Sequence, residues 1–271
     1  YKTVLENELI DNDVDFLYSS YVTNLLVDEK GKPAGVVIAN RSGRQAIRCK
    51  GIIDATHNAS VARMSDIQVK NAGQGAVEFN YTVVGNGKKE SANITHAEVL
   101  PLPVLSGGKE YPVTRYTFLM PLKNDSYAAL MEIEQTVRTQ TWDPDQVDSS
   151  DLLWYIPQQV ITCKKACNEV SGSIRQLPTE AFQAEKYPNL WILGPCAELP
   201  RESMKTVMRP INAVFLGELL GEEIGFRTQL LSMPAQTIVY QKKVNASDYG
   251  QIGEVLLPLR PLLHKNTVNS P

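Results

Sequence analysis

The sequence predicts an α/β fold that carries an inserted, largely antiparallel α+β region. Two short apolar segments, 51–55 and 188–194, are each followed by small and polar residues, as in buried parallel strands that lead into ligand-binding loops. Between them, residues 67–123 contain strand-like runs separated by glycine turns, which is typical of antiparallel sheets. Two kinds of sheet are therefore expected in one chain.

The overall composition is that of an ordinary globular protein, with 271 residues of which 43% are hydrophobic and 21% charged. Lys and Arg number 27 against 30 Asp and Glu, so the net charge of −3 indicates no basic surface for nucleic acid. No apolar run approaches the roughly 18 residues of a membrane span. A soluble protein is expected, and cytoplasmic and periplasmic locations both stay open.

The first ten residues have the apolar spacing of an amphipathic helix, and the chain begins without an initiator Met or an apolar signal segment. We interpret this start as the middle of such a helix, with an N-terminal segment missing. Residues 16–27, 34–39 and 45–49 then read as three extended runs separated by polar turns. They predict a β-meander that leads into the apolar strand at 51–55.

The rest of the chain reads as strands covered by helices, followed by a return to the first region. Expected strands lie at 77–84, 98–105, 113–122, 188–194 and 236–244, and expected helices at 126–139, 149–170 and 203–224. We divide the chain into a partial first domain (1–66), an inserted substrate domain (67–187), a return to the first domain (188–225) and a C-terminal extension or linker (226–271).

Three segments carry a resemblance to a known family: Val22 within Ser20–Asn24, the meander that ends in Asp54-Ala55-Thr56, and the strand that ends in Gly194-Pro195 with its following helix. In this order they resemble the FAD-dependent oxidoreductases of the two-dinucleotide-binding-fold type. The likeness is strongest to a bacterial subgroup with a substrate domain inserted in the flavin domain. It covers residues 1–66 and 188–225.

This resemblance implies a partial Rossmann-like FAD-binding domain and hydride transfer from a small organic substrate to flavin. The helix after the last strand would point its N-terminal N–H groups at the flavin or at a phosphate. The cofactor-binding residues it implies are Val22, Ala55, Thr56, Gly194, Pro195, Glu198 and Ser203.

The pyrophosphate-binding motif of that family is absent, because no GxGxxG follows a strand anywhere in the sequence. The glycine pairs at 73–75 and 85–87 lack a following helix and read as turns. FAD is therefore expected in the parent protein but not on this chain alone, which is expected to be inactive. The missing N-terminal segment would be its partner, together with a small-molecule substrate.

Catalytic residues stay unknown, and only two weak candidates stand out. His57 occupies the place of the glycine in the family's Ala-Thr-Gly turn; a surface loop residue is favoured over a catalytic base. Arg201 and Arg209 flank the start of the last helix. They could clamp a carboxylate or a phosphate, although plain surface charges are favoured.

Other patterns favour structure over chemistry. Cys163 and Cys167 on a predicted helix indicate packed thiols rather than a zinc site, so no metal is expected. The aromatics at 142, 154 and 155 favour a helix–sheet core over a sugar-stacking platform. Glycines at 217, 221 and 225 recur on one helix face, as for close packing against another helix.

Two other functions stay open. One is a degenerate flavin-fold module that serves as a binding or scaffold domain of a larger protein, suggested by His57 and the missing motif. The other is a carbohydrate lyase, because large bacterial proteins of this subgroup are sometimes labelled xanthan lyase. No Tyr, His and Arg constellation supports the lyase, which ranks last.

Overall fold

The computed structural model describes residues 2–73, 75–85, 87–124, 126–167 and 174–241. Its helices are α1 (Lys2–Asp11), α2 (Ser60–Arg63), α3 (Tyr127–Thr141), α4 (Arg201–Val207) and α5 (Pro210–Gln229), with 3₁₀ turns η1 (Ile174–Gln176) and η2 (Thr179–Ala181). Its strands are β1 (Tyr21–Val27), β2 (Pro33–Asn40), β3 (Gly43–Arg48), β4 (Ile52–Asp54), β5 (Val69–Asn71), β6 (Ala76–Val84), β7 (Ile94–Val99), β8 (Val104–Ser106), β9 (Lys109–Tyr111), β10 (Val113–Pro121), β11 (Asp148–Ser149), β12 (Trp154–Tyr155), β13 (Gln159–Ile161), β14 (Leu190–Ile192) and β15 (Ile238–Val239).

The predicted meander is confirmed as an antiparallel sheet with strand order β15-β1-β2-β3. The turn between β1 and β2 is fixed by Asp28, whose Oδ1 accepts hydrogen bonds from the backbone N–H groups of Lys30 and Lys32, each at 2.9 Å. Gly31 adopts a φ of +74° there, which glycine tolerates best. Strand β1 begins at Tyr21 instead of at residue 16. Of the strand predicted at 236–244, β15 is a short part, and residues 242–244 lie outside the described residues.

The apolar segments 51–55 and 188–194 form strands, and these pair in parallel with each other. Strands β4 and β14 align Ile52 with Leu190 and Asp54 with Ile192. All three residues of β14 are buried, which explains the uninterrupted apolar run of that segment. The carboxyl ends of both strands therefore meet at one edge.

The inserted region contains an antiparallel sheet of order β11-β6-β10-β7, with β12 also paired to β6. Helix α3 packs on it as predicted. Its N-cap residue is Ser126, whose side chain accepts a hydrogen bond from the N–H of Ala129. The helix predicted at 149–170 is wrong within the described residues. Pro157 disfavours a helix there, and the flanking Trp154, Tyr155, Val160 and Ile161 suit strands.

Two smaller predictions also shift. The strand predicted at 98–105 is divided between β7 and β8, because Pro101 and Pro103 interrupt it. The helix predicted at 203–224 is two helices, because Pro210 has no N–H and begins α5 as its first residue. No helix among the described residues is long and apolar enough to cross a membrane.

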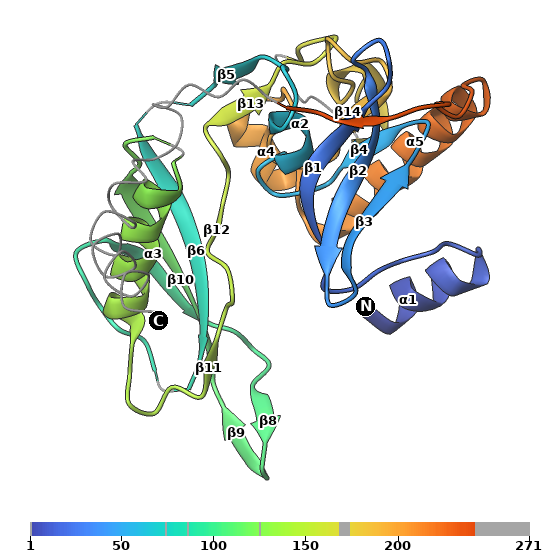
Figure 1. The fold of residues 1–271 in the computed structure, drawn as a ribbon. Coiled ribbons are helices and arrows are strands. Elements are labelled where there is room, and N and C mark those ends of the chain that lie inside the picture. Colours follow the sequence, from blue (N-terminus) through green and yellow to red (C-terminus); the bar gives the residue numbers. More distant parts are fainter. Residues whose placement is uncertain (1, 74, 86, 125, 168–173, 242–271) are drawn as a thin grey trace, which may run out of the picture.

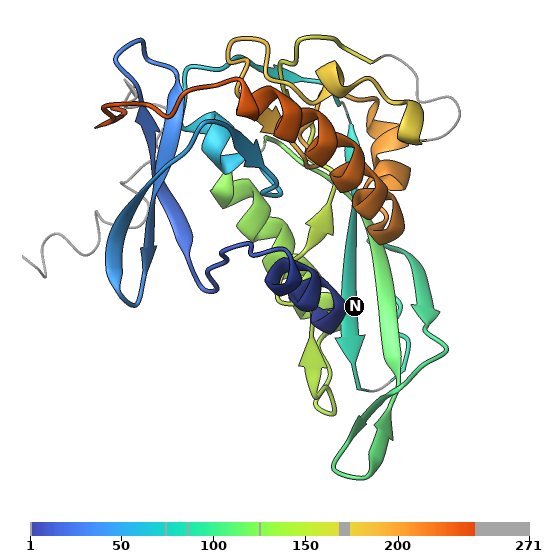
Figure 2. The ribbon, with the colours of Figure 1, turned by 90° about the vertical axis from the view of Figure 1, so that its right-hand side faces the viewer.

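The buried side chains form two separate hydrophobic clusters. One lies around β4, β14 and α5 and includes Trp191, Leu216 and Phe182; the other joins α3 to Phe79 and Phe118 of the antiparallel sheet. Figure 1 shows the sheet of α3 on one side of the molecule and the meander with α5 on the other, with β5 and β13 between them. The hairpin of β8 and β9 projects from the sheet in both views (Figures 1 and 2). The domain boundaries stay a prediction.

Candidate functional site

The loops that follow β4 and β14 lie side by side at the carboxyl edge of the parallel pair. The N–H of Leu193 donates to the carbonyl of Asp54 at 3.0 Å. A Cβ added to Gly194 would lie 3.0 Å from the carbonyl oxygen of Thr56, so a side chain there would crowd the neighbouring loop. The sequence thus brings residues 54–57 and 194–196 together at the edge where α/β sheets bind ligands.

Asp54 organises the first of these loops. Its side chain is 1% exposed, and Oδ1 accepts hydrogen bonds from the Thr56 N–H at 3.1 Å and the Thr56 hydroxyl at 2.6 Å. Oδ2 accepts from the N–H of Ala62 at 2.9 Å. Sequence reasoning flagged this loop but missed Asp54 itself; an acidic residue at the end of an apolar strand was the available signal.

His57 is half-buried, which corrects its interpretation as a surface loop residue. Its ring meets that of Tyr155 edge to face, with centroids 5.0 Å apart. The Nε2 atom is buried and has no hydrogen-bond partner among the described residues. Burial lowers the pKa of the imidazole below its usual value, so the ring is neutral near pH 7. Because β12 replaces a predicted helix, Tyr155 can reach this loop.

Arg201 is neither a free surface charge nor an available anion clamp. Its Nη1 donates to the carbonyls of Pro157 at 3.1 Å and Pro195 at 2.6 Å. Its Nη2 donates to Ala197 at 2.6 Å and Leu199 at 2.7 Å. The guanidinium therefore ties together the loop after β14, and its burial lowers its pKa. Arg209, by contrast, is exposed.

The other residues implied by the resemblance differ in burial and in whether their side chains already bond to protein groups. The carboxylate of Glu198 already accepts hydrogen bonds from the Cys163 N–H at 2.7 Å and from Lys70 Nζ at 3.0 Å. Ala55 is exposed, Pro195 is buried, and Val22 and Ser203 are half-buried. Helix α4, which begins at Arg201, has only seven residues and no side-chain cap. Whether any of these residues contacts a cofactor stays a prediction.

Cys163 and Cys196 are buried, and Cys49 and Cys167 are half-buried. The helix predicted around Cys163 and Cys167 is wrong, because Cys163 forms an isolated bridge with Ala184. Burial raises the pKa of the Cys163 thiol to about 12. Within the described residues, no group of three side chains could hold a metal ion.

The aromatic residues fill a core only in part. Tyr155 is buried, whereas Trp142 is 62% exposed and Trp154 is 38% exposed. The prediction of a filled helix–sheet core is thus correct for Tyr155 and wrong for Trp142. The two exposed indoles are the aromatics that a stacking platform would need, but no described contact joins them.

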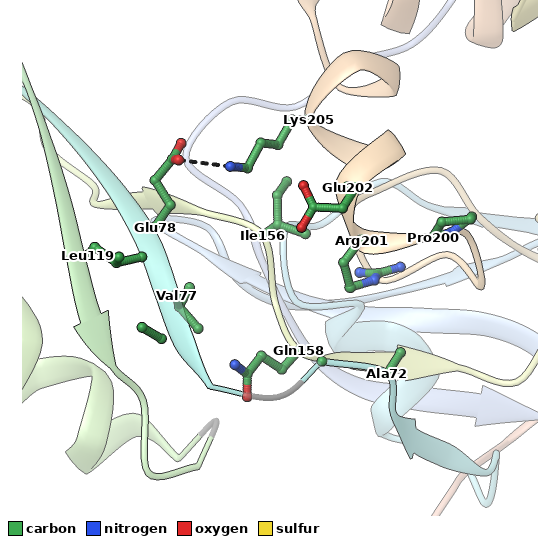
Figure 3. A pocket seen from close by; sticks show the side chains of 12 residues that line it. Ala72, Val77, Glu78, Leu119, Ile156, Gln158, Pro200, Arg201, Glu202 and Lys205 are labelled. Carbon is green, nitrogen blue, oxygen red and sulfur yellow. Dashed lines mark hydrogen bonds and ion pairs between the residues drawn. The ribbon is translucent and has the colours of Figure 1, made fainter. Parts of the chain in front are cut away.

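A cavity of about 550 Å³ lies between the antiparallel sheet and α4. Val77, Leu119 and Ile156 form its apolar wall. From α4, Glu202 and Lys205 reach into it (Figure 3). The volume suits a small organic molecule.

Lys205 and Glu78 form an ion pair across this cavity, with Nζ and Oε2 2.8 Å apart. Burial alone would raise the pKa of Glu78, but the hydrogen bonds from Lys205 and Asn80 outweigh it and hold the pKa below its usual value. Both side chains are partly exposed, so the pair contributes at most about 1 kcal/mol to stability. Its role is to join α4 to β6 at the rim of the cavity. Figure 3 shows the head of Arg201 turned from the sheet toward Pro200.

A family model described as FAD dependent oxidoreductase matches residues 1–188 of the chain. No curated protein matches it. Solved structures with a similar arrangement include a triple mutant of the flavin-dependent brominase Bmp2 (11% identity, 86% of this chain and 57% of that chain, TM-score 0.47). Another is the aromatic hydroxylase CabE from angucycline biosynthesis (16% identity, 97% of this chain and 52% of that chain, TM-score 0.40). A third is p-nitrophenol 4-monooxygenase PnpA from Pseudomonas putida DLL-E4 (11% identity, 83% of this chain and 54% of that chain, TM-score 0.42). The chain spans about half the length of these three structures.

Proposed function

The chain belongs to the FAD dependent oxidoreductase family, and from that premise we propose that it forms the substrate-facing part of an enzyme that oxidises a small organic molecule. Bound FAD would supply the acceptor for a hydride. Holding the pyrophosphate would need a glycine-rich βαβ unit, which this sequence does not contain. We propose that such a unit belongs to the parent protein and that this chain alone is inactive.

The observation that carries the proposal is the position of the 550 Å³ cavity beside the loop that follows β14. Pro200 and Arg201 line the cavity, and Arg201 also holds the carbonyl of Pro195, the residue after Gly194. One short loop therefore separates the cavity from the carboxyl edge of the parallel strands. This is the adjacency that a substrate site needs beside a cofactor at that edge.

The residues that line the cavity would contact different parts of a substrate. Val77, Leu119 and Ile156 would take up the apolar body of a substrate and exclude water from it. The carboxylate of Glu202 has no described partner and would orient a polar substituent. Lys205 shares its ammonium group with Glu78. His57, which is neutral and lies on the adjoining loop, is the group that could accept a proton.

The residues at the edge fit a flavin in part. Gly194 leaves space that a Cβ would fill beside Thr56, and the Nε2 of His57 is a buried polar atom without a partner. The charged side chains of the same loops fit less well, because Glu198 and Arg201 already bond to protein groups. The fit therefore rests on backbone and on His57.

The test is flavin retention by the protein expressed together with the coding sequence upstream of Tyr1. We expect a purified protein with the visible absorption bands of oxidised flavin. Gly194→Val should remove most of the bound flavin, because its side chain would enter the contact with Thr56. Gly87→Ala is the matched control, since a Cβ at Gly87 meets nothing within 4 Å. A folded but colourless protein would refute the proposal.

A second candidate function is a scaffold domain that has lost its cofactor. It is supported by Glu198 and Arg201, whose charged groups already bond to backbone groups of the protein. The same experiment separates the two functions. In a scaffold, the longer protein would be colourless, and Gly194→Val would lower stability without any change in absorption.

A further inference from the structure

We propose that a second cavity, at the amino ends of β4 and β14, binds a small organic anion with a flat apolar body. This cavity has a volume of about 320 Å³. Lys50 and Asn189, which precede β4 and β14, line it. The cavity of about 550 Å³ lies beside the loop that follows the carboxyl end of β14, so the two cavities are at opposite ends of these strands.

The walls of the second cavity are apolar and fixed in place. They include Pro33, Leu231 and the indole of Trp191. Trp191 is 1% exposed and lies against Gly51, where an added Cβ would be 2.9 Å from its ring. The segment after α5 lines one side of the cavity and is held by Arg48, whose Nη1 donates to the carbonyl of Ala235 at 3.2 Å. The cavity therefore exists before any ligand enters.

Its charged groups favour an anion. Lys32, Lys50 and Arg227 line the cavity against one carboxylate, that of Asp28. Neither Lys32 nor Lys50 forms an ion pair with a described residue, so both can turn to a ligand. Asp28 is oriented by the two backbone N–H groups of its turn, and its single negative charge is outnumbered by the two lysines.

Two nearby features oppose an anion, but each is compensated. The C-terminal end of α5 carries partial negative charge, yet the carbonyls of Arg227 and Thr228 accept hydrogen bonds from Leu230 and Leu231. Glu223 carries a full charge but is paired with Arg227. The two unpaired lysines thus dominate the local field.

Asn189 fixes one side of the cavity. Its Nδ2 donates to the carbonyls of Pro33 at 2.7 Å and Lys50 at 3.2 Å, which fixes the backbone that carries Lys50. Its Oδ1 is buried without a partner among the described residues. This oxygen is an acceptor and lies out of reach of the cavity, so Asn189 contributes by holding the backbone of Pro33 and Lys50 in place.

The size of the cavity narrows the ligand class. Small-molecule sites range from roughly 300 to 1,000 Å³, so this cavity stands at the lower end. It suits an aromatic carboxylate of one or two rings, with the ring against the apolar wall and the carboxylate at the lysines.

The experiment measures the binding of 2-naphthoate to the full chain by calorimetry, with 2-naphthalenemethanol as the neutral analogue. We expect the anion to bind more tightly than the alcohol. Lys32→Gln and Lys50→Gln should each weaken binding about two- to fivefold, the range for a partly exposed ion pair. Lys30→Gln is the matched control, because Lys30 belongs to the same turn as Lys32 but does not line the cavity.

Three outcomes would overturn the proposal: equal binding of the alcohol and the anion, affinity unchanged by both lysine variants, or no binding at millimolar concentration. Lys205→Gln serves as a further control for the larger cavity. A fourth outcome, loss of binding in Lys205→Gln with binding kept in Lys50→Gln, would place the anion in the larger cavity and also overturn the proposal.

Discussion

Thr56 donates its hydroxyl to the buried carboxylate of Asp54 at 2.6 Å, two residues back along the chain. The same hydroxyl oxygen accepts a hydrogen bond from the N–H of Ser60 at 2.7 Å. Together with the bond from Ala62 to Asp54, these contacts close the loop that follows β4 and start α2. They set the position of His57, which lies inside this loop.

Asp54→Asn should destabilise the chain by about 2–4 kcal/mol, because an amide nitrogen would face N–H and O–H donors and the charge-assisted bonds would be lost. Urea unfolding measures the change. Asp15→Asn, at an exposed position, is the control and should stay within about 0.5 kcal/mol of wild type. An Asp54→Asn midpoint equal to that of the control would mean that the carboxylate does not organise the loop.

Arg201→Lys should cost about 2–3 kcal/mol, because an ammonium group cannot reach four carbonyls that surround a planar guanidinium. Arg209→Lys, on the exposed start of α5, should be nearly neutral. Thermal unfolding of both variants distinguishes the roles. Equal stability, combined with a loss of anion binding only in Arg201→Lys, would instead support the clamp that the sequence suggested.

The elements that the sequence predicted well are those whose pattern is local. The meander alternates and has a glycine turn, α3 has a serine cap, and β4 and β14 are apolar runs too short for helices. These features reflect backbone preference and burial within a few residues. The apolar pattern of 51–55 and 188–194 predicts two buried strands, and the structure shows that they pair with each other.

The errors arose where distant contacts decide the conformation. Residues 149–170 have apolar spacing compatible with a helix, yet β11 and β12 pair with β6 and β13 pairs with β5. The same strand pairing brings Tyr155 to His57. The wrong helix prediction at 149–170 therefore also led to the wrong interpretation of His57 as a surface residue. Arg201 shows a further limit, because no sequence pattern reveals that four carbonyls converge on one guanidinium.

The burial of His57 predicts a pH dependence of stability. Its pKa in the folded chain lies below the ordinary value of 6.5, so below about pH 6.5 the unfolded chain takes up a proton that the folded chain resists. Stability should therefore be complete above pH 6.5 and fall as the pH drops toward the folded pKa. Urea midpoints at pH 7.5 and 5.5 should differ less in His57→Gln than in wild type. His96→Gln, at an exposed residue of β7, is the matched control.

The glycine stripe on α5 predicts a stabilising substitution. A Cβ added at Gly217, Gly221 or Gly225 meets nothing within 4 Å, so in this chain the glycines face open space. Alanine favours a helix over glycine by about 0.8–1 kcal/mol, and Gly221→Ala should therefore raise the free energy of unfolding by nearly that amount, measured in urea. In a longer protein whose flavin-binding helix packs on this face, the same substitution should lose the gain and weaken flavin retention. A gain of equal size in both proteins would show that nothing packs closely on this face.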